Sequence, residues 1–278
     1  MKLSTARILL TGAAGGLGTA TALRLARGGA ALLLADRDEA ALGRLADQLQ
    51  SRGTPVAWLA GDITSAADRQ RLFARAGQWR GGVNVLINNA GLNDFALLED
   101  QDEARIEASL RVNVLAPILI CRGMLPALSA LPEAHVINIG STFGSIGYPG
   151  YAPYCATKFA IRGFTEAMRR ETADGNVHFH YLAPRAARTA LNTSNVNAMN
   201  EALGVAMDPP EVVAEAVAEV IERDRRETYI GWPERLFVRI NALFPRLVDS
   251  SLRKQLPTIK EYATGSRPGA VTEGGTLA

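Results

Sequence analysis

The chain has 278 residues, 47% of them hydrophobic, and its 30 basic and 28 acidic residues give a formal net charge of +2. This size and apolar content suit one α/β domain with a well-buried core, and so balanced a charge excludes the basic surface typical of nucleic-acid binding. The two cysteines, Cys121 and Cys155, fit a reduced, cytoplasmic setting. We expect neither a signal peptide nor a membrane-spanning segment, because the apolar runs are short.

Short apolar runs alternate with amphipathic stretches over residues 1–232, which is typical of a parallel sheet covered by helices on both faces. We expect a Rossmann-type, doubly wound, seven-stranded parallel sheet in a single catalytic domain. The strands are expected at Ile8–Leu10, Ala31–Ala35, Val56–Ala60, Val83–Ile87, His135–Ile139, Val177–Leu182 and Thr228–Gly231.

A glycine-rich turn follows the first expected strand, and a helix is expected to begin near Thr19. Glycines allow the backbone to turn tightly and to approach a pyrophosphate, and the amino end of the helix offers free N–H groups to the phosphates. A plain tight turn between strand and helix is the alternative. We expect the phosphate-binding turn to comprise Gly12, Gly16, Leu17 and Gly18.

Acidic residues follow the second and third expected strands. Asp36 stands where a carboxylate accepts both ribose hydroxyls of the adenosine, which favours NAD over NADP. Arg37 works against this preference because its guanidinium can reach a 2′-phosphate, so NADP stays possible. Asp62, followed by Ile63, either accepts from the adenine amino group or caps a helix.

Tyr154 and Lys158 are four residues apart, so a helix places both on one face. A nearby ammonium stabilises the phenolate and is expected to lower the tyrosine pKa from about 10. Lysine is rare here, with four lysines among 30 basic residues, and its compact head also grips ribose hydroxyls. Ser141 follows the fifth strand, where its hydroxyl meets a substrate oxygen or caps a turn.

These motifs resemble the short-chain dehydrogenase/reductase family, in its main subfamily of about this length. The matching elements, in the family's order, are Thr11-Gly-x-x-x-Gly-x-Gly18, Asn88-Asn89-Ala90-Gly91, Asn113, Ser141, Tyr154-x-x-x-Lys158 and Pro184…Thr189. The resemblance implies a Ser141–Tyr154–Lys158 triad with Asn113 in a proton relay. It also implies that Asn89 supports the central strands, that Thr189 touches the nicotinamide carboxamide, and that the other cofactor-binding residues include Ala90, Gly91 and Pro184.

The resemblance implies an NAD(H)-dependent oxidoreductase that moves hydride between the nicotinamide and an alcohol or ketone, with Tyr154 as general acid and base. An NADPH-dependent ketoreductase of the 3-oxoacyl type and a non-catalytic dinucleotide sensor are the alternatives. A homodimer or homotetramer is expected, through the helices that contain Asn113 and Tyr154. The expected substrate is a medium-sized lipophilic or aromatic molecule, and the residues expected to line its pocket are Asn93, Phe143, Tyr148 and Tyr151.

Two positions depart from the family pattern or add to it. Arg185 stands where the family carries glycine after Pro184, and it or Arg188 either binds an anionic group on the substrate or faces solvent. Pro117 lies four residues after Asn113 and removes the helical partner of the Asn113 carbonyl. That carbonyl either holds a water leading to Lys158 or marks a simple helix kink.

The expected substrate loop spans residues 185–208, and its Asn192–Asn200 part is polar and expected to be mobile. A helical extension over 233–262, divided at Pro245, carries an apolar stripe that packs onto the domain or a partner subunit, or lies on a membrane surface. The tail from 263 to 278 is expected to be disordered. His178 and His180 share one strand face, but no third ligand is apparent, so no metal site is expected.

Overall fold

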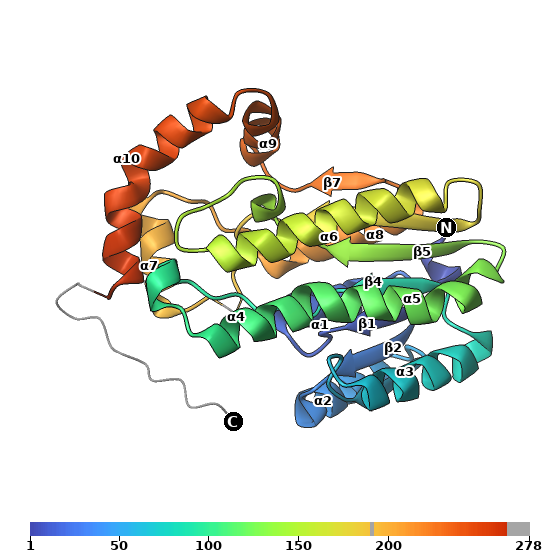
Figure 1. Cartoon of the computed structure of the whole chain (residues 1–278). Helices are drawn as coiled ribbons and strands as arrows, with labels where there is room; N and C mark the ends of the chain where they lie inside the picture. The colour runs from blue at the N-terminus through green and yellow to red at the C-terminus, as the bar shows by residue number, and fades with distance from the viewer. Residues whose placement is uncertain (190–191, 266–278) are drawn as a thin grey trace.

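A computed structural model describes residues 1–189 and 192–265 of the chain. Its described part contains a seven-stranded, wholly parallel sheet of order β3-β2-β1-β4-β5-β6-β7 (Figure 1). The expected fold class is confirmed. The strands are β1 (Arg7–Thr11), β2 (Ala31–Asp36), β3 (Val56–Ala60), β4 (Val85–Asn88), β5 (Ala134–Ile139), β6 (Val177–Ala183) and β7 (Glu227–Tyr229).

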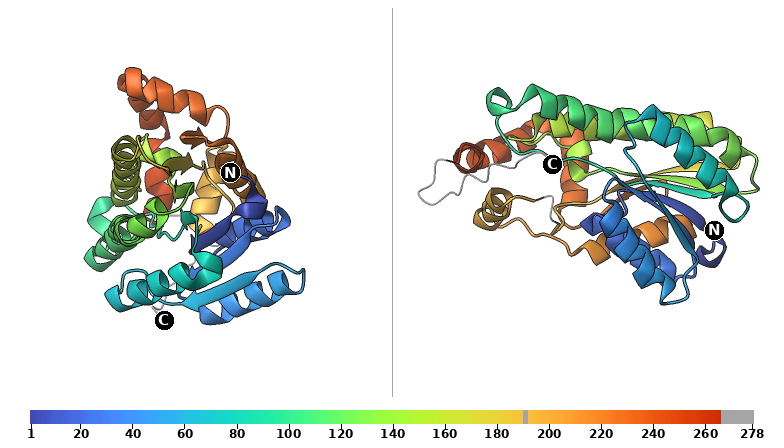
Figure 2. Two further views of the ribbon diagram at one scale, coloured as in Figure 1. Left: turned by 90° about the vertical axis from the view of Figure 1, so that its right-hand side faces the viewer. Right: turned by 90° about the horizontal axis from the view of Figure 1, so that it is seen from below.

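Helices cover both faces of the sheet (Figure 2). One apolar cluster joins the sheet to α1 (Gly16–Arg27), α2 (Glu39–Gln50) and α8 (Pro210–Arg223). A second cluster joins the opposite face to α3 (Ala66–Gln78), α5 (Ala116–Ser129) and α6 (Ala152–Glu171). The inner strands β1, β2 and β4 are buried on both faces, which explains why their sequences are continuous apolar runs.

Helix α1 begins at Gly16 rather than near Thr19, because the end of the glycine turn already forms its first turn. Gly15 is the extended residue before the helix, and its carbonyl accepts from the Thr19 N–H at 2.8 Å. The free N–H groups of the helix therefore belong to the glycine turn itself.

The expectation that no segment is long and apolar enough to cross a membrane is wrong. Helix α4 (Glu103–Leu110), a π-helical turn over Arg111–Leu115 and α5 form one 27-residue stretch, and an 18-residue window within it has a mean hydropathy of 1.6. Within the fold, α5 uses part of this apolar surface in the core. Its inward side chains are Ile120, Cys121, Met124 and Leu128.

Residues 194–202, expected as a mobile loop, form helix α7 (Ser194–Ala202). Thr193 caps it by accepting from the Val196 N–H at 3.3 Å, and Val196 and Met199 bury one apolar face. Polar composition misled the prediction because the apolar residues on that face are few but correctly spaced for a helix.

Two further helices follow the sheet, α9 (Glu234–Leu243) and α10 (Pro245–Ala263), and Pro245 separates them. Helix α10 packs against α7, on the side of the sheet where the strands end (Figure 1). Val196, Met199, Ile259 and Tyr262 form an apolar cluster, here called the roof, with Tyr151 from the start of α6. The disordered tail is predicted from residue 263, but Ala263 still belongs to α10; the part of the tail beyond residue 265 lies outside the described residues.

Candidate active site

The carboxyl ends of β1 and β4 lie side by side at the point where the strand order reverses, which is where open α/β sheets bind ligands. The turn after β1 requires glycine at two positions. Gly12 has φ +64°, and an added Cβ would lie 2.7 Å from the Ala90 Cα. A Cβ on Gly18 would lie 2.0 Å from the Gly12 carbonyl oxygen. This crowded turn, with the amino end of α1 behind it, fits a dinucleotide pyrophosphate.

Asn89 fastens β4 to this turn. Its Nδ2 donates to the carbonyls of Thr11 at 3.1 Å and Gly12 at 2.9 Å, and its backbone N–H donates to the Thr11 hydroxyl at 3.1 Å. Asn89 thus spans the two central strands at their carboxyl ends.

Asp36 lies beside the glycine turn. Its Oδ2 accepts from the Ala14 N–H at 3.0 Å, so the carboxylate is held at the edge of the expected adenosine site. Arg37 is exposed next to it.

Asp62 accepts from both the N–H and the hydroxyl of Thr64 at 2.8 Å, whereas Ser65 is the residue that caps α3. The helix-capping interpretation of Asp62 is therefore wrong. Asp62 and Ile63 border a small hollow beside Ala35 and Leu59, between the ends of β2 and β3.

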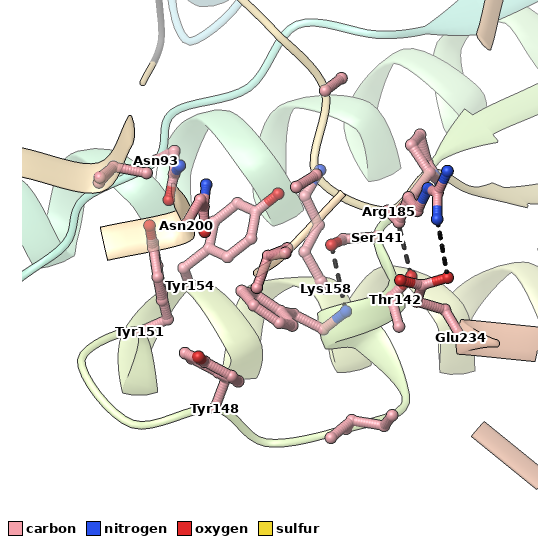
Figure 3. Close-up of a pocket in the computed structure, with 18 of the residues that line it drawn as sticks. Asn93, Ser141, Thr142, Tyr148, Tyr151, Tyr154, Lys158, Arg185, Asn200 and Glu234 are labelled. Carbon is pink, nitrogen blue, oxygen red and sulfur yellow. Dashed lines mark hydrogen bonds and ion pairs between the residues drawn. The ribbon is translucent and has the colours of Figure 1, made fainter. Parts of the chain in front are cut away.

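The three residues of the expected triad meet at one cavity (Figure 3). Tyr154 and Lys158 lie one turn apart on α6, and the Lys158 Nζ is 5.6 Å from the centre of the Tyr154 ring. Ser141 follows β5, and its Oγ accepts from the Phe143 N–H at 3.1 Å. The arrangement presents two hydroxyls and one amine to a single bound molecule.

Burial shifts the two titrating groups of this pair in opposite directions. It raises the pKa of Tyr154 to about 12, opposed by the Ser141 hydroxyl, and it lowers the pKa of Lys158 to about 8. The lowered tyrosine pKa is expected beside the oxidised nicotinamide as well as Lys158, so it stays a prediction for the cofactor-bound protein. In the structure the Lys158 ammonium donates to the Ile139 carbonyl at 3.0 Å.

Asn113 lies in the π-helical turn, and its side chain is buried. Its Oδ1 accepts from the Leu92 N–H at 2.7 Å, and its Nδ2 donates to the Leu92 carbonyl at 2.9 Å and to Thr157 at 3.1 Å. The helix here is widened by a π turn rather than simply kinked, as is frequent at functional sites. The water between the Asn113 carbonyl and Lys158 stays a prediction.

Tyr181 positions Ser141, and sequence reasoning missed it. The Tyr181 hydroxyl donates to the Ser141 carbonyl at 3.0 Å and accepts from the Ser141 N–H at 3.3 Å. A Cβ on Gly140 would lie 2.2 Å from the Tyr181 ring, so the ring requires glycine there. The sequence indicated only that a glycine precedes Ser141 at the end of a strand. It did not indicate that Tyr181 of β6 packs against this glycine.

A cavity of about 480 Å³ extends from the triad between the roof and α9. Its aromatic wall includes Phe143 and Tyr148, stacked with ring centres 4.8 Å apart. All five residues expected to contact the substrate lie in its lining: Asn93, Phe143, Tyr148, Tyr151 and Arg185. Val196, Met199 and Asn200 of the expected substrate loop also line it, and sequence reasoning missed the lining residues Thr142, Glu234, Phe237, Ile240, Leu247 and Leu252.

Arg185 neither faces solvent nor offers a free cation. Its guanidinium binds both carboxylate oxygens of Asp208, at 2.9 and 2.6 Å, and contacts Glu234 at 3.3 Å (Figure 3). Binding of a substrate anion and exposure to solvent, the two roles expected for Arg185, are therefore both replaced by a structural role. Arg185 links the two ends of the 185–208 segment to each other and to α9. Arg188 is exposed.

The expectation that His178 and His180 lack a third neighbour is also wrong. His135 from β5 and Asp224 from the end of α8 adjoin them, away from the cavity. Strand register, which the sequence does not reveal, creates this cluster.

A doubly wound sheet with a glycine turn and a tyrosine–lysine pair at its carboxyl edge defines a Rossmann-fold oxidoreductase. Residues 6–200 match the family described as short chain dehydrogenase. The chain belongs to the short-chain dehydrogenase/reductase family.

Individual relatives agree with this assignment. The uncharacterized oxidoreductase YxnA of Bacillus subtilis is 30% identical over 260 residues, covering 91% of this chain and 73% of YxnA. A short-chain dehydrogenase/reductase from Burkholderia phymatum, solved in complex with NAD, has a TM-score of 0.80 at 26% identity and covers 89% of this chain and 96% of its own. The 3-ketoacyl-(acyl-carrier-protein) reductase from Brucella melitensis, complexed with NADH, has a TM-score of 0.75 at 28% identity, covering 82% and 96%.

Proposed function

We propose that this protein is an NAD(H)-dependent oxidoreductase that interconverts a secondary alcohol and its ketone. One observation carries the proposal: Ser141, Tyr154 and Lys158 line the same cavity as Leu17, Asn89 and Thr189 around the glycine turn. A dinucleotide held at that turn and a substrate held by the hydroxyls share this space.

Three features fit a nicotinamide dinucleotide, and one of them, Asp36, favours NAD over NADP. The glycine turn and α1 offer N–H groups to the pyrophosphate. Asp36, anchored to Ala14, offers a carboxylate to the ribose hydroxyls and disfavours a 2′-phosphate. Thr189 lies against Gly16, so it is available to the carboxamide end of the cofactor. Two relatives were solved with NAD or NADH, in keeping with this choice.

When bound, the nicotinamide supplies the hydride chemistry, and the protein supplies the proton and the alignment. Ser141 donates a hydrogen bond to the substrate oxygen while Tyr154 gives that oxygen a proton or takes one from it. Lys158 holds ribose hydroxyls and, as an ammonium, lowers the cost of a phenolate on Tyr154. Asn113 keeps the Leu92 segment and α6 in place for this exchange.

The proposed substrate is medium-sized, lipophilic or aromatic, and without a group that requires a free cation. The cavity wall is largely aromatic and aliphatic, and the nearby guanidinium of Arg185 is already matched by Asp208 and Glu234. Helices α9 and α10 contribute part of the wall, so the extension takes part in substrate choice. Its outward apolar residues Leu243 and Phe244 suit contact with a membrane surface as a secondary role.

A panel of alcohols with NAD and NADP, and of ketones with the reduced cofactors, followed at 340 nm, tests the proposal. Turnover of neutral aromatic or alicyclic substrates with NAD is expected. Tyr154→Phe keeps NAD binding within about twofold and lowers kcat by at least about 100-fold, because the proton donor is lost. Comparable turnover by the Tyr154→Phe variant and the parent protein would refute the proposal that Tyr154 transfers the proton.

We also propose a homodimer or homotetramer formed through α4 and α6. Leu110 of α4, Leu115 of the π-helical turn and Phe159 of α6 are each 43–50% exposed, forming an apolar surface suited to a second copy of the chain.

A further inference from the structure

All three histidines of the chain meet near the amino ends of β5 and β6, away from the catalytic cavity. Parallel register sets His135 beside His178, and His180 follows on the same face of β6. Asp224, at the end of α8, completes the cluster. No step of the proposed reaction uses these residues.

Three ligand atoms in this cluster surround one point. The His135 Nδ1 lies 2.9 Å from the His180 Nε2, and the Asp224 Oδ1 lies 4.0 Å from the first and 3.7 Å from the second. Zinc with bonds of about 2.0 Å in a tetrahedral arrangement needs ligand atoms about 3.3 Å apart. The observed spacings bracket that value, and the two carboxylate distances are too long for hydrogen bonds.

The outer contacts of the two buried imidazoles fix which nitrogens face each other. The His180 Nδ1 lies 2.9 Å from the Arg225 carbonyl, which can only accept, so this nitrogen carries the proton. The His135 Nε2 lies 3.2 Å from the Glu133 carboxylate, so it also carries its proton. In the neutral rings, the facing nitrogens then both present lone pairs at 2.9 Å, and a cation relieves their repulsion.

These outer contacts are also those of metal-ligating histidines, which donate the second ring N–H to a carboxylate or a backbone carbonyl. Asp224 has a comparable support, because the His178 Nδ1 lies 2.9 Å from its Oδ1. Asp224 also has φ +51°, a left-handed conformation that glycine or asparagine usually adopts at the end of a helix. The presence of aspartate there is consistent with a role for its carboxylate.

We propose that His135, His180 and Asp224 form a structural zinc site that fastens the end of α8 to β5 and β6. Two imidazoles and one carboxylate are a donor set that zinc prefers. The imidazoles are 0% and 1% exposed, whereas the side chains of Asp224 and His178 are 45% and 37% exposed and give the ion access from solvent. The fourth position falls to water.

The test uses the full chain without a polyhistidine tag, stripped with EDTA and then titrated with Zn²⁺. Metal analysis after gel filtration should give one zinc per chain, and Tm should rise by about 5 °C at saturating Zn²⁺. Co²⁺ in place of Zn²⁺ should give the visible absorption of a tetrahedral site.

Asp224→Gly is the decisive variant, because glycine suits the left-handed conformation and the fold should persist. It should lose at least tenfold in zinc affinity, and His180→Asn should lose more. Glu222→Gln removes a neighbouring carboxylate from α8 outside the cluster and serves as the matched control, with unchanged affinity. Less than 0.1 zinc per chain, or equal binding by the Asp224→Gly variant and the parent, overturns the proposal. If Tm changes on acidification in EDTA but not on addition of Zn²⁺, the facing nitrogens of His135 and His180 share a proton instead of a metal ion. That result also overturns the proposal.

Discussion

The buried lysine of the catalytic pair should cost the free protein stability, and Lys158→Met measures that cost. Lys158 is 7% exposed, and burial lowers the pKa of its ammonium from 10.5 to about 8. The folded protein therefore releases this proton at a lower pH than the unfolded chain. The cost of burial is fully present below pH 8 and disappears as the pH rises above 10.5.

The size of the effect follows from the two pKa values. Linkage gives a cost of about 3 kcal/mol at pH 7 and about 1.5 kcal/mol at pH 9.5. Methionine keeps the length of the side chain without the charge, but it leaves the Ile139 carbonyl without its donor, which costs about 1–2 kcal/mol. At pH 7 the variant should therefore be more stable than the parent by about 1–2 kcal/mol, and it should be inactive.

Urea unfolding of both proteins without cofactor, at pH 7 and pH 9.5, provides the measurement. The stability advantage of Lys158→Met should shrink by about 1.5–2 kcal/mol between the two pH values. Lys254→Met, at an exposed lysine of α10, is the matched control and should show no such change. If the advantage of the Lys158 variant is the same at both pH values, the reasoning from burial fails.

Three further predictions concern the cofactor, the serine and the assembly. Asp36→Asn should lower the ratio of kcat/KM for NAD over NADP by about tenfold, because a charged acceptor of the ribose hydroxyls is lost; an unchanged ratio would remove Asp36 from cofactor choice. Tyr181→Phe should lower kcat about tenfold with KM for NAD unchanged, because Ser141 loses the hydroxyl that holds its backbone. A parallel rise of that KM would indicate general disruption instead. Leu115→Glu should shift the protein to a smaller species in light scattering, because it charges a side chain that is 50% exposed on the expected interface; an unchanged mass would place the interface elsewhere.

The sequence determined the sheet and the order of its elements. The central strands are mostly apolar runs between helices with one apolar face, so local pattern and burial agree there. The glycine turn and the Tyr154–Lys158 spacing were readable for the same reason, because their chemistry depends on neighbours along the chain. Helix α7 also had a local signal, because Thr193 can cap a helix in which Val196 and Met199 lie on one face. The many polar residues of this segment led to the prediction of a loop instead.

Contacts between distant segments were decided only by the tertiary structure. Arg185 meets Asp208 and Glu234, and Tyr181 meets Ser141, through the packing of separate elements. The direction of the Lys158 ammonium depends on where the β5 carbonyl lies, and burial by the surrounding elements raises the pKa of Tyr154. Strand register likewise gathers the histidines. Local periodicity fixes which face of an element is apolar, but it does not specify which partner that face meets.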